Sequence, residues 1–161
     1  MHPHRASDWR YAYRVTINMN CELCAEPGGD LLWEDAFCRV VRVTDAAGEA
    51  FPGFCRVVWH QHVAEMSALA SRDARHVMDI VLATERALHR IVQPDKINLA
   101  SLGNLVPHLH WHVIPRWKDD SHFPAPIWGA AQRPAIVRPI PANANLLCAL
   151  KAELSTLSEM P

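Results

Sequence analysis

The chain has 161 residues, of which 50% are hydrophobic and 20% are charged, a composition that argues against extended disorder. Its formal net charge of −1 excludes a general affinity for nucleic acid or anionic membranes, so any phosphate recognition has to be local. Residues 1–10 lack the apolar core of a signal peptide, and no later segment reaches the ~18 apolar residues of a membrane span, which predicts a cytoplasmic protein.

Short strands are expected in the first part of the chain. The run LLWEDAFCRVVRV (31–43) predicts two strands around a turn at Glu34–Asp35. Residues 45–53 (DAAGEAFPG) predict a loop, and residues 54–59 predict the next strand.

Two helices are expected to follow these strands. Residues 62–70 (HVAEMSALA) indicate a short helix, and Ser71 is placed to cap a longer helix that Pro94 ends. The apolar side chains of the longer helix recur at helical spacing and lie near one stripe, which comprises Val77, Val81, Leu88 and Ile91. This is the long helix of the predicted domain.

The last part of the chain is predicted to contain two strands, an arm and a helix. KINLASLGN (96–104) alternates as a strand does and turns at Gly103–Asn104 into the segment VPHLHWHVIPR (106–116). Residues 118–141 are rich in Pro and Trp and show little periodicity, which predicts an ordered arm over the surface. A final helix is indicated by a leucine stripe that packs on the core or on another subunit, namely Leu146, Leu150, Leu154 and Leu157.

This order of elements favours an α+β fold. We expect a largely antiparallel five-stranded sheet packed with two helices, followed by the arm and the C-terminal helix. The length suits a single domain over 1–161, in which the C-terminal arm and helix occupy 118–161.

Three histidines alternate within the apolar segment 106–116. In a strand, His108, His110 and His112 would lie on one face, with neighbours roughly 7 Å apart, while Trp111 would face the core. Neutral imidazole is a capable nucleophile near pH 7, and flanking histidines can donate hydrogen bonds to phosphate oxygens, which favours nucleophilic catalysis at phosphorus. Two other interpretations fit the same row: a metal site, because a His-x-His pair on a strand suits zinc, and a solvent-facing strand that happens to carry histidines.

The pattern of the segment HLHWHVI is His, apolar, His, apolar, His, apolar, apolar, which resembles the signature of the histidine triad (HIT) superfamily of nucleotide hydrolases and transferases. VVWHQHVAEMSAL is similar to the family segment in which a strand ends at a histidine that opens a helix. INLASLGNLVP is similar to the strand and loop before the triad, and together these segments cover about 21–117. The resemblance implies a HIT-like fold, a nucleoside phosphate substrate and a homodimer.

The resemblance also implies catalytic roles. In the family, the middle histidine attacks the α-phosphate of a nucleotide and gives a nucleotidyl-histidine intermediate, which water or another acceptor resolves. Transferred to this chain, the nucleophile is His110, and His112 contacts the phosphate or the leaving group. His108 would hold the site in register with His62. No cofactor is required for this chemistry.

The substrate-binding residues implied by the resemblance lie before the triad. Asn98 is the expected ribose contact, and Gly103 with Asn104 is the expected phosphate contact. Two alternatives to this enzyme remain open: a zinc-dependent hydrolase that uses the triad as ligands, and a non-catalytic nucleotide-binding regulatory module. Arg116, which follows the triad, is either another anion partner or a surface residue at the end of the strand.

The sequence NCELC carries a Cys-x-x-Cys pair, Cys21 and Cys24, whose spacing suits two thiolate ligands of one zinc ion. A redox pair or two unrelated core cysteines share this spacing. Some HIT proteins use such a pair together with two histidines to bind structural zinc, which here implies Cys21, Cys24, His62 and His108 as ligands. The other cysteines are scattered among apolar neighbours and are expected to be reduced and buried: Cys38, Cys55 and Cys148.

Trp128 in the arm is expected to pack against its own domain, with a nucleotide base or a partner subunit as alternative contacts. The remaining histidines of the core and arm show no constellation in the sequence, namely His60, His76, His89 and His122.

Overall fold

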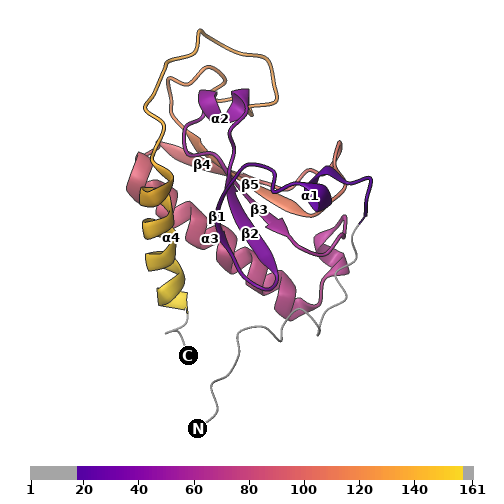
Figure 1. The fold of residues 1–161 in the computed structure, drawn as a ribbon. Helices are drawn as coiled ribbons and strands as arrows, with labels where there is room; N and C mark the ends of the chain where they lie inside the picture. The colour runs from indigo at the N-terminus through magenta and orange to yellow at the C-terminus, as the bar shows by residue number, and fades with distance from the viewer. Residues whose placement is uncertain (1–17, 158–161) are drawn as a thin grey trace.

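The computed structural model describes residues 18–157, so the segment 1–10 considered above lies outside the described residues. Its centre is an antiparallel five-stranded sheet in the order β1-β2-β3-β5-β4 (Figure 1). The strands are β1 (Asp30–Glu34), β2 (Cys38–Arg42), β3 (Cys55–Trp59), β4 (Lys96–Ala100) and β5 (His110–Arg116). The expected α+β fold is confirmed.

The long helix α3 (Ser71–Val92) packs against the central strands β3 and β5 (Figure 1). The predicted stripe is turned to the core, because Val77, Val81 and Leu88 are buried and Ile91 is partly buried against them. Each such fully buried side chain contributes roughly 1.5–3 kcal/mol relative to an exposed one. The helix ends before Gln93, which has a left-handed φ of 46°, and Pro94 follows as predicted.

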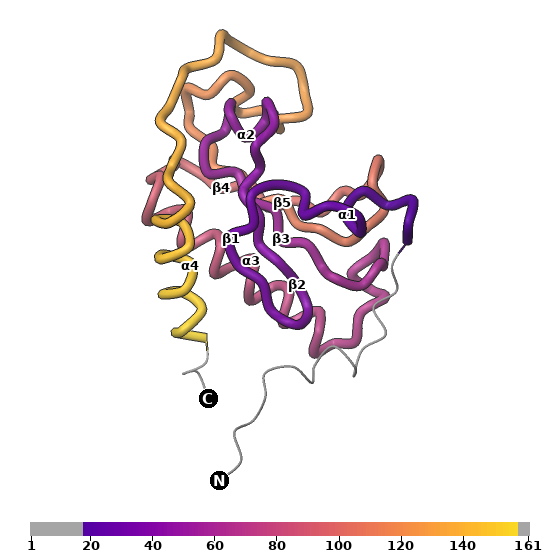
Figure 2. The backbone as a smooth tube through the Cα atoms, in the orientation of Figure 1, coloured from indigo at the N-terminus to yellow at the C-terminus, as the bar shows by residue number. Residues whose placement is uncertain are grey.

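Helix α4 (Asn143–Leu157) packs beside α3 (Figure 2). Its leucine stripe packs on the hydrophobic core of its own chain. Leu146 and Leu150 are buried there, and Leu154 and Leu157 are partly buried against the same core. Cys148 lies off this stripe and is exposed, so its predicted burial is wrong, whereas Cys38 and Cys55 are buried. Among residues 18–157, no helix is both long and apolar enough to cross a membrane.

The predicted helix over 62–70 and the predicted capping role of Ser71 are both wrong. Residues 62–70 form only one 3-10 turn, η2 (Met66–Ala68), because the backbone before it pairs with another segment: Leu109 N donates to Val63 O at 2.6 Å. A carbonyl engaged across the chain in this way is not available for a helical hydrogen bond. Helix α3 begins at Ser71 itself, and no side chain caps it.

The predicted loop 45–53 contains a short helix, α2 (Ala46–Ala50). Asp45 caps it, since its carboxylate accepts hydrogen bonds from the backbone N of Ala47 and Gly48. An aspartate before an alanine-rich run is a typical helix start, so the sequence carried this signal.

The arm that follows β5 has no regular secondary structure but is fastened by a buried ion pair. Arg116 Nε lies 2.8 Å and Nη2 lies 3.0 Å from the two carboxylate oxygens of Asp120, and both side chains are 1% exposed. Arg116 Nη2 also donates to Ala125 O, so the surface position considered for this arginine is wrong. Asp120 accepts further bonds from the backbone N of Trp117, His122 and Phe123.

These contacts set the ionisation of Asp120. Burial alone would raise its pKa, but the hydrogen bonds from Arg116 and from the backbone lower the pKa to about 2. The carboxylate is therefore charged at neutral pH and holds both Arg116 and the start of the arm.

We expect Asp120→Asn to lower the free energy of unfolding by about 3–5 kcal/mol, because it leaves the Arg116 guanidinium buried without its counter-charge. Denaturant unfolding at pH 7 measures this change. The matched control is Asp119→Asn, because the exposed carboxylate of Asp119 pairs with Arg138. This substitution should lower the free energy of unfolding by less than about 1 kcal/mol. Equal effects of the two substitutions would contradict the assigned role of Asp120.

Candidate active site

The three triad histidines are buried but do not form the single row that strand alternation predicted. Strand β5 begins at His110, so His108 precedes the strand, and its ring contacts His62 with centroids 5.2 Å apart. The rings of His110 and His112 lie side by side with centroids 4.7 Å apart. His108 therefore joins one cluster of side chains, whereas His110 and His112 line another site.

One backbone carbonyl fixes the orientation of the His110 ring. His110 Nδ1 lies 2.6 Å from the backbone oxygen of His108. A carbonyl oxygen only accepts, so Nδ1 carries the proton and Nε2 keeps its lone pair. Burial is the main cause that lowers the pKa of His110, and the charge of Arg56 lowers it further. The ring is therefore neutral near pH 7, with its unprotonated nitrogen available for attack.

His112 is the more strongly shifted of the two rings. Burial, His110 and Arg56 together lower its pKa to about 3. Its ring lies between Phe54 and Trp128, with centroids 5.7 Å and 5.1 Å away, and among the described residues its buried Nδ1 has no hydrogen-bond partner. A neutral ring that lacks a protein partner can orient an N–H toward a bound anion.

The low pKa of His112 predicts a loss of stability in acid. The folded state resists protonation, while the unfolded chain takes up a proton below its pKa of about 6.5, so stability is lost as the pH falls below 6.5. Between pH 7 and pH 5 we expect this histidine to lower the free energy of unfolding by about 2 kcal/mol. In His112→Asn this part of the pH dependence should be absent. Denaturant unfolding at both pH values tests this.

The control for this measurement is His89→Asn, since His89 is exposed on α3. It should keep the pH dependence of the wild type. Identical losses between pH 7 and pH 5 in the wild type and in His112→Asn would contradict a buried neutral His112.

His110 and His112 open into a cleft of about 380 Å³. The loop before β5 forms one wall, including the expected phosphate contacts Gly103 and Asn104. Gly103 has a φ of 67°, a left-handed conformation that favours glycine there. The remaining lining residues are Glu22, Leu23, Arg56, Leu102, Leu105, Val106 and Trp128.

The structure places Asn98 elsewhere. Its Oδ1 accepts a hydrogen bond of 2.7 Å from Arg116, and its side chain lines a neighbouring cavity of about 430 Å³ together with Ile114. Trp128 lines both spaces. The expected ribose contact thus belongs to the adjoining cavity rather than to the cleft of His110.

Two residues line the cleft that the sequence did not assign to it, Arg56 and Trp128. Arg56 on β3 is the register partner of His112 on β5, and the signal for it was a single charged residue in the apolar strand FCRVVW. Trp128 packs against His112 of its own chain, as expected, but is 51% exposed and lines the cleft. Sequence periodicity does not place an irregular arm over a site.

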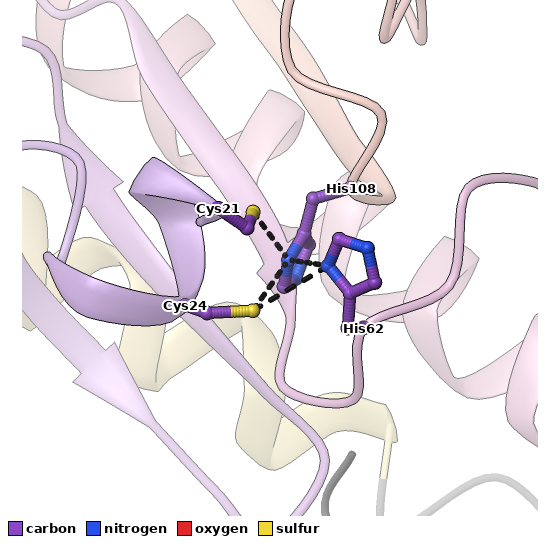
Figure 3. A group of neighbouring side chains, drawn as sticks. All are labelled: Cys21, Cys24, His62 and His108. Atoms are coloured by element: carbon purple, nitrogen blue, oxygen red, sulfur yellow. Dashed lines mark hydrogen bonds between the residues drawn. The ribbon is translucent and has the colours of Figure 1, made fainter. Parts of the chain in front are cut away.

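A second cluster brings Cys21, Cys24, His62 and His108 together (Figure 3). Helix α1 (Glu22–Ala25) positions the two cysteines, because Cys21 is its N-cap residue and Cys24 lies within it. His62 Nδ1 and His108 Nδ1 lie 3.3 Å apart. The sulfur atoms of Cys21 and Cys24 lie 3.4–3.5 Å from these nitrogens. The edges of a zinc tetrahedron with Cys₂His₂ ligands are about 3.3–3.8 Å long, given Zn–S and Zn–N bonds of about 2.3 and 2.0 Å.

The hydrogen bond on the far side of His108 also suits a metal ligand. His108 Nε2 donates to the backbone oxygen of Trp59 at 2.6 Å, which leaves the Nδ1 lone pair directed into the cluster. Metal-binding histidines usually carry such a second hydrogen bond. The four residues therefore fit a structural zinc ion.

A smaller group of ligand-type residues lies at the β1–β2 turn. The Asp35 carboxylate accepts hydrogen bonds from the backbone N of Phe37 and Cys38. It also lies 2.6 Å from His76 Nε2. His76 thus has a structural partner that the sequence did not indicate. Among residues 18–157, neither group of three or more potential metal ligands includes His110 or His112, which disfavours the triad as a catalytic zinc site.

The comparisons with known proteins agree with this fold. The HIT domain family matches residues 30–119, and the chain belongs to this family. A protein of Mycobacterium tuberculosis named AP-4-A phosphorylase is 29% identical over 93 residues, which are 54% of this chain and 48% of that protein. The chain therefore spans about half the length of this relative.

Solved structures of HIT proteins share the fold. A histidine triad protein from Bradyrhizobium japonicum is 29% identical with a TM-score of 0.60, covering 77% of this chain and 90% of that one. One from Marinobacter aquaeolei is 26% identical with a TM-score of 0.61, covering 89% and 97%.

Proposed function

We propose that the chain is a hydrolase or nucleotidyl transferase that cleaves at the α-phosphate of a nucleoside phosphate derivative through a covalent intermediate on His110. One observation carries this proposal: the His108 carbonyl holds the proton of His110 on Nδ1, so the opposite nitrogen is a neutral nucleophile. The cleft of about 380 Å³ beside it is large enough to hold a nucleotide-sized ligand.

The reaction needs two displacements at phosphorus. In the first, His110 Nε2 forms a bond to the α-phosphorus while the bond to the leaving group breaks, and the leaving group takes the electron pair. The ring then gains positive charge, which the His108 carbonyl stabilises through the Nδ1 proton. In the second, water or another acceptor forms the new bond to phosphorus while the bond to His110 Nε2 breaks and its electron pair returns to the ring. The proton of the attacking group is lost to solvent, and His110 is neutral again with its proton on Nδ1.

The other cleft residues have positioning roles in this proposal. His112 contacts the phosphate or the leaving group, while Gly103 and Asn104 supply donors to the phosphoryl oxygens. Asn98 stays a proposed ribose contact, reached through the adjoining cavity beside Trp128. His108 and His62 act indirectly, by fixing the backbone that orients His110.

We further propose that Cys21, Cys24, His62 and His108 bind structural zinc. The tetrahedral spacing of their ligand atoms supports this. When bound, zinc would supply cross-linking between α1 and the segment before β5 rather than Lewis-acid chemistry. Reduced cysteines are needed for such a site, which supports the proposed cytoplasmic location.

The scope of the proposal follows the family. The bond cleaved is a phosphoanhydride or a phosphoramidate, and the relative named AP-4-A phosphorylase favours dinucleoside polyphosphates as one substrate class. We propose one domain acting as a homodimer on a small molecule, without nucleic-acid or membrane partners.

A substrate panel tests this function. Purified protein is expected to turn over adenosine 5′-phosphoramidate, diadenosine polyphosphates or both, with AMP or ADP among the products. Binding of AMP without turnover of either class would favour the regulatory module instead. Turnover that stops immediately on chelation, before any loss of folded protein, would favour the zinc-dependent hydrolase.

A further inference from the structure

We propose that Arg56 binds the departing phosphate groups of the substrate and thereby makes this site prefer phosphoanhydride substrates over phosphoramidates. The inference rests on the proposed function, because it assigns the leaving-group side of the same cleft. It adds a residue and a substrate preference that the family signature does not contain.

The sheet register brings Arg56 to the catalytic histidines. Arg56 on β3 is the Cα partner of His112 on the adjacent strand β5, and cross-strand partners project from the same face of a sheet. Arg56 accordingly lines the cleft together with His110 and His112. Its guanidinium carbon lies 5.7 Å from the centroid of the Phe54 ring, so an apolar wall flanks the charge.

The guanidinium of Arg56 is incompletely paired. Nη1 donates to Gly28 O at 3.1 Å, and Nη2 lies 3.7 Å from a carboxylate oxygen of Asp45, whose side chain is 59% exposed. Nε is buried and has no hydrogen-bond partner among the described residues. A buried donor without a partner is unfavourable, and the residue that carries it lines the cleft of His110, where a bound anion would give the guanidinium a further partner.

Two other arginines of the chain, the buried Arg116 and the partly buried Arg42, have protein partners on their Nε atoms. Arg116 uses Nε and both terminal nitrogens on Asp120, Asn98 and Ala125. Arg42 donates through Nε to Asn143 and through Nη2 to Asp30. Arg56 differs from them because its Nε has no partner among the described residues and because the residue lines the cleft that holds the proposed nucleophile.

The charge balance of the cleft gives the Arg56 side chain a function. Among the described residues that line it, Arg56 supplies positive charge and Glu22 supplies negative charge, while Asn104 and the backbone offer only neutral donors. A phosphoanhydride leaves as a phosphate chain that gains negative charge as the P–O bond breaks. A phosphoramidate leaves as an amine that ends neutral once protonated. A fixed cation beside the leaving group therefore stabilises the first transition state more than the second.

The test compares kcat/KM of Arg56→Gln and wild type on diadenosine tetraphosphate and on adenosine 5′-phosphoramidate. We expect a loss of about 100-fold or more on the anhydride and of less than about 5-fold on the phosphoramidate. Arg56→Lys should recover part of the loss on the anhydride, because it restores the charge without the planar fork. The control is Arg75→Gln, which removes an exposed arginine of α3 and should change neither value.

A binding measurement that does not depend on turnover accompanies the kinetics. Inorganic tripolyphosphate should bind the wild type at least about 10-fold more tightly than Arg56→Gln, or than Arg56→Lys if the glutamine variant does not fold. Equal losses on both substrates with unchanged tripolyphosphate binding would overturn the role of Arg56 and leave the proposed function standing. If the wild type turned over neither substrate, the proposed function would fail first, and this inference with it.

Discussion

His110→Ala should lower kcat by about 10⁴-fold or more on any substrate that the wild type turns over, because it removes the atom that forms the bond to phosphorus. Nucleotide affinity should change only a few-fold, since the rest of the cleft stays in place. Steady-state kinetics together with calorimetric titration of AMP measure both quantities.

The control for this variant is His89→Ala, which removes an exposed histidine of α3 and should retain wild-type turnover. Full activity of His110→Ala would show that His110 is not the nucleophile. A comparable loss in both variants would mean that the assay reports folding rather than chemistry.

Loss of the Cys₂His₂ cluster should have the second large effect. Cys24→Ser is expected to lower the zinc content from about one ion per chain to a small fraction, because one of four ligands is lost. The free energy of unfolding should fall by several kcal/mol, as structural zinc sites contribute directly to folding. Metal analysis of the purified protein and denaturant unfolding measure these changes.

Cys148→Ser is the matched control, since Cys148 is an exposed thiol outside the cluster. It should alter neither the zinc content nor the stability. A wild-type protein that is purified without zinc and gains no stability from added zinc would contradict the metal proposal, while the role of His110 would stand.

Several features of the site were predictable because their signals are local. The spacing of HLHWHVI placed His110 and His112 side by side, and strand alternation turned Trp111 toward the core. The Cys-x-x-Cys pair was visible as a candidate ligand pair, although only the fold brings it to His62 and His108. The sheet and the long helix followed from their periodicity.

The features that the sequence did not predict depend on long-range contacts. Residues 62–70 carry a helical pattern, but the pairing of Val63 with Leu109 holds their start extended. For Arg116 the sequence left an anion partner and a surface position open, because its partner Asp120 belongs to an arm without periodicity. Arg56 became a cleft residue only through its register with His112 on a strand far along the chain.

The covalent intermediate is the central claim, and rapid acid-free quenching of a turnover reaction followed by peptide mass spectrometry tests it most directly. Neutral conditions are needed because a phosphorus–nitrogen bond to imidazole is labile in acid. We predict a nucleotidyl group on the peptide that contains His110, located on that residue and missing in His110→Ala. An enzyme that turns over nucleotides in the same samples while His110 stays unmodified, or while another residue carries the group, would contradict the account.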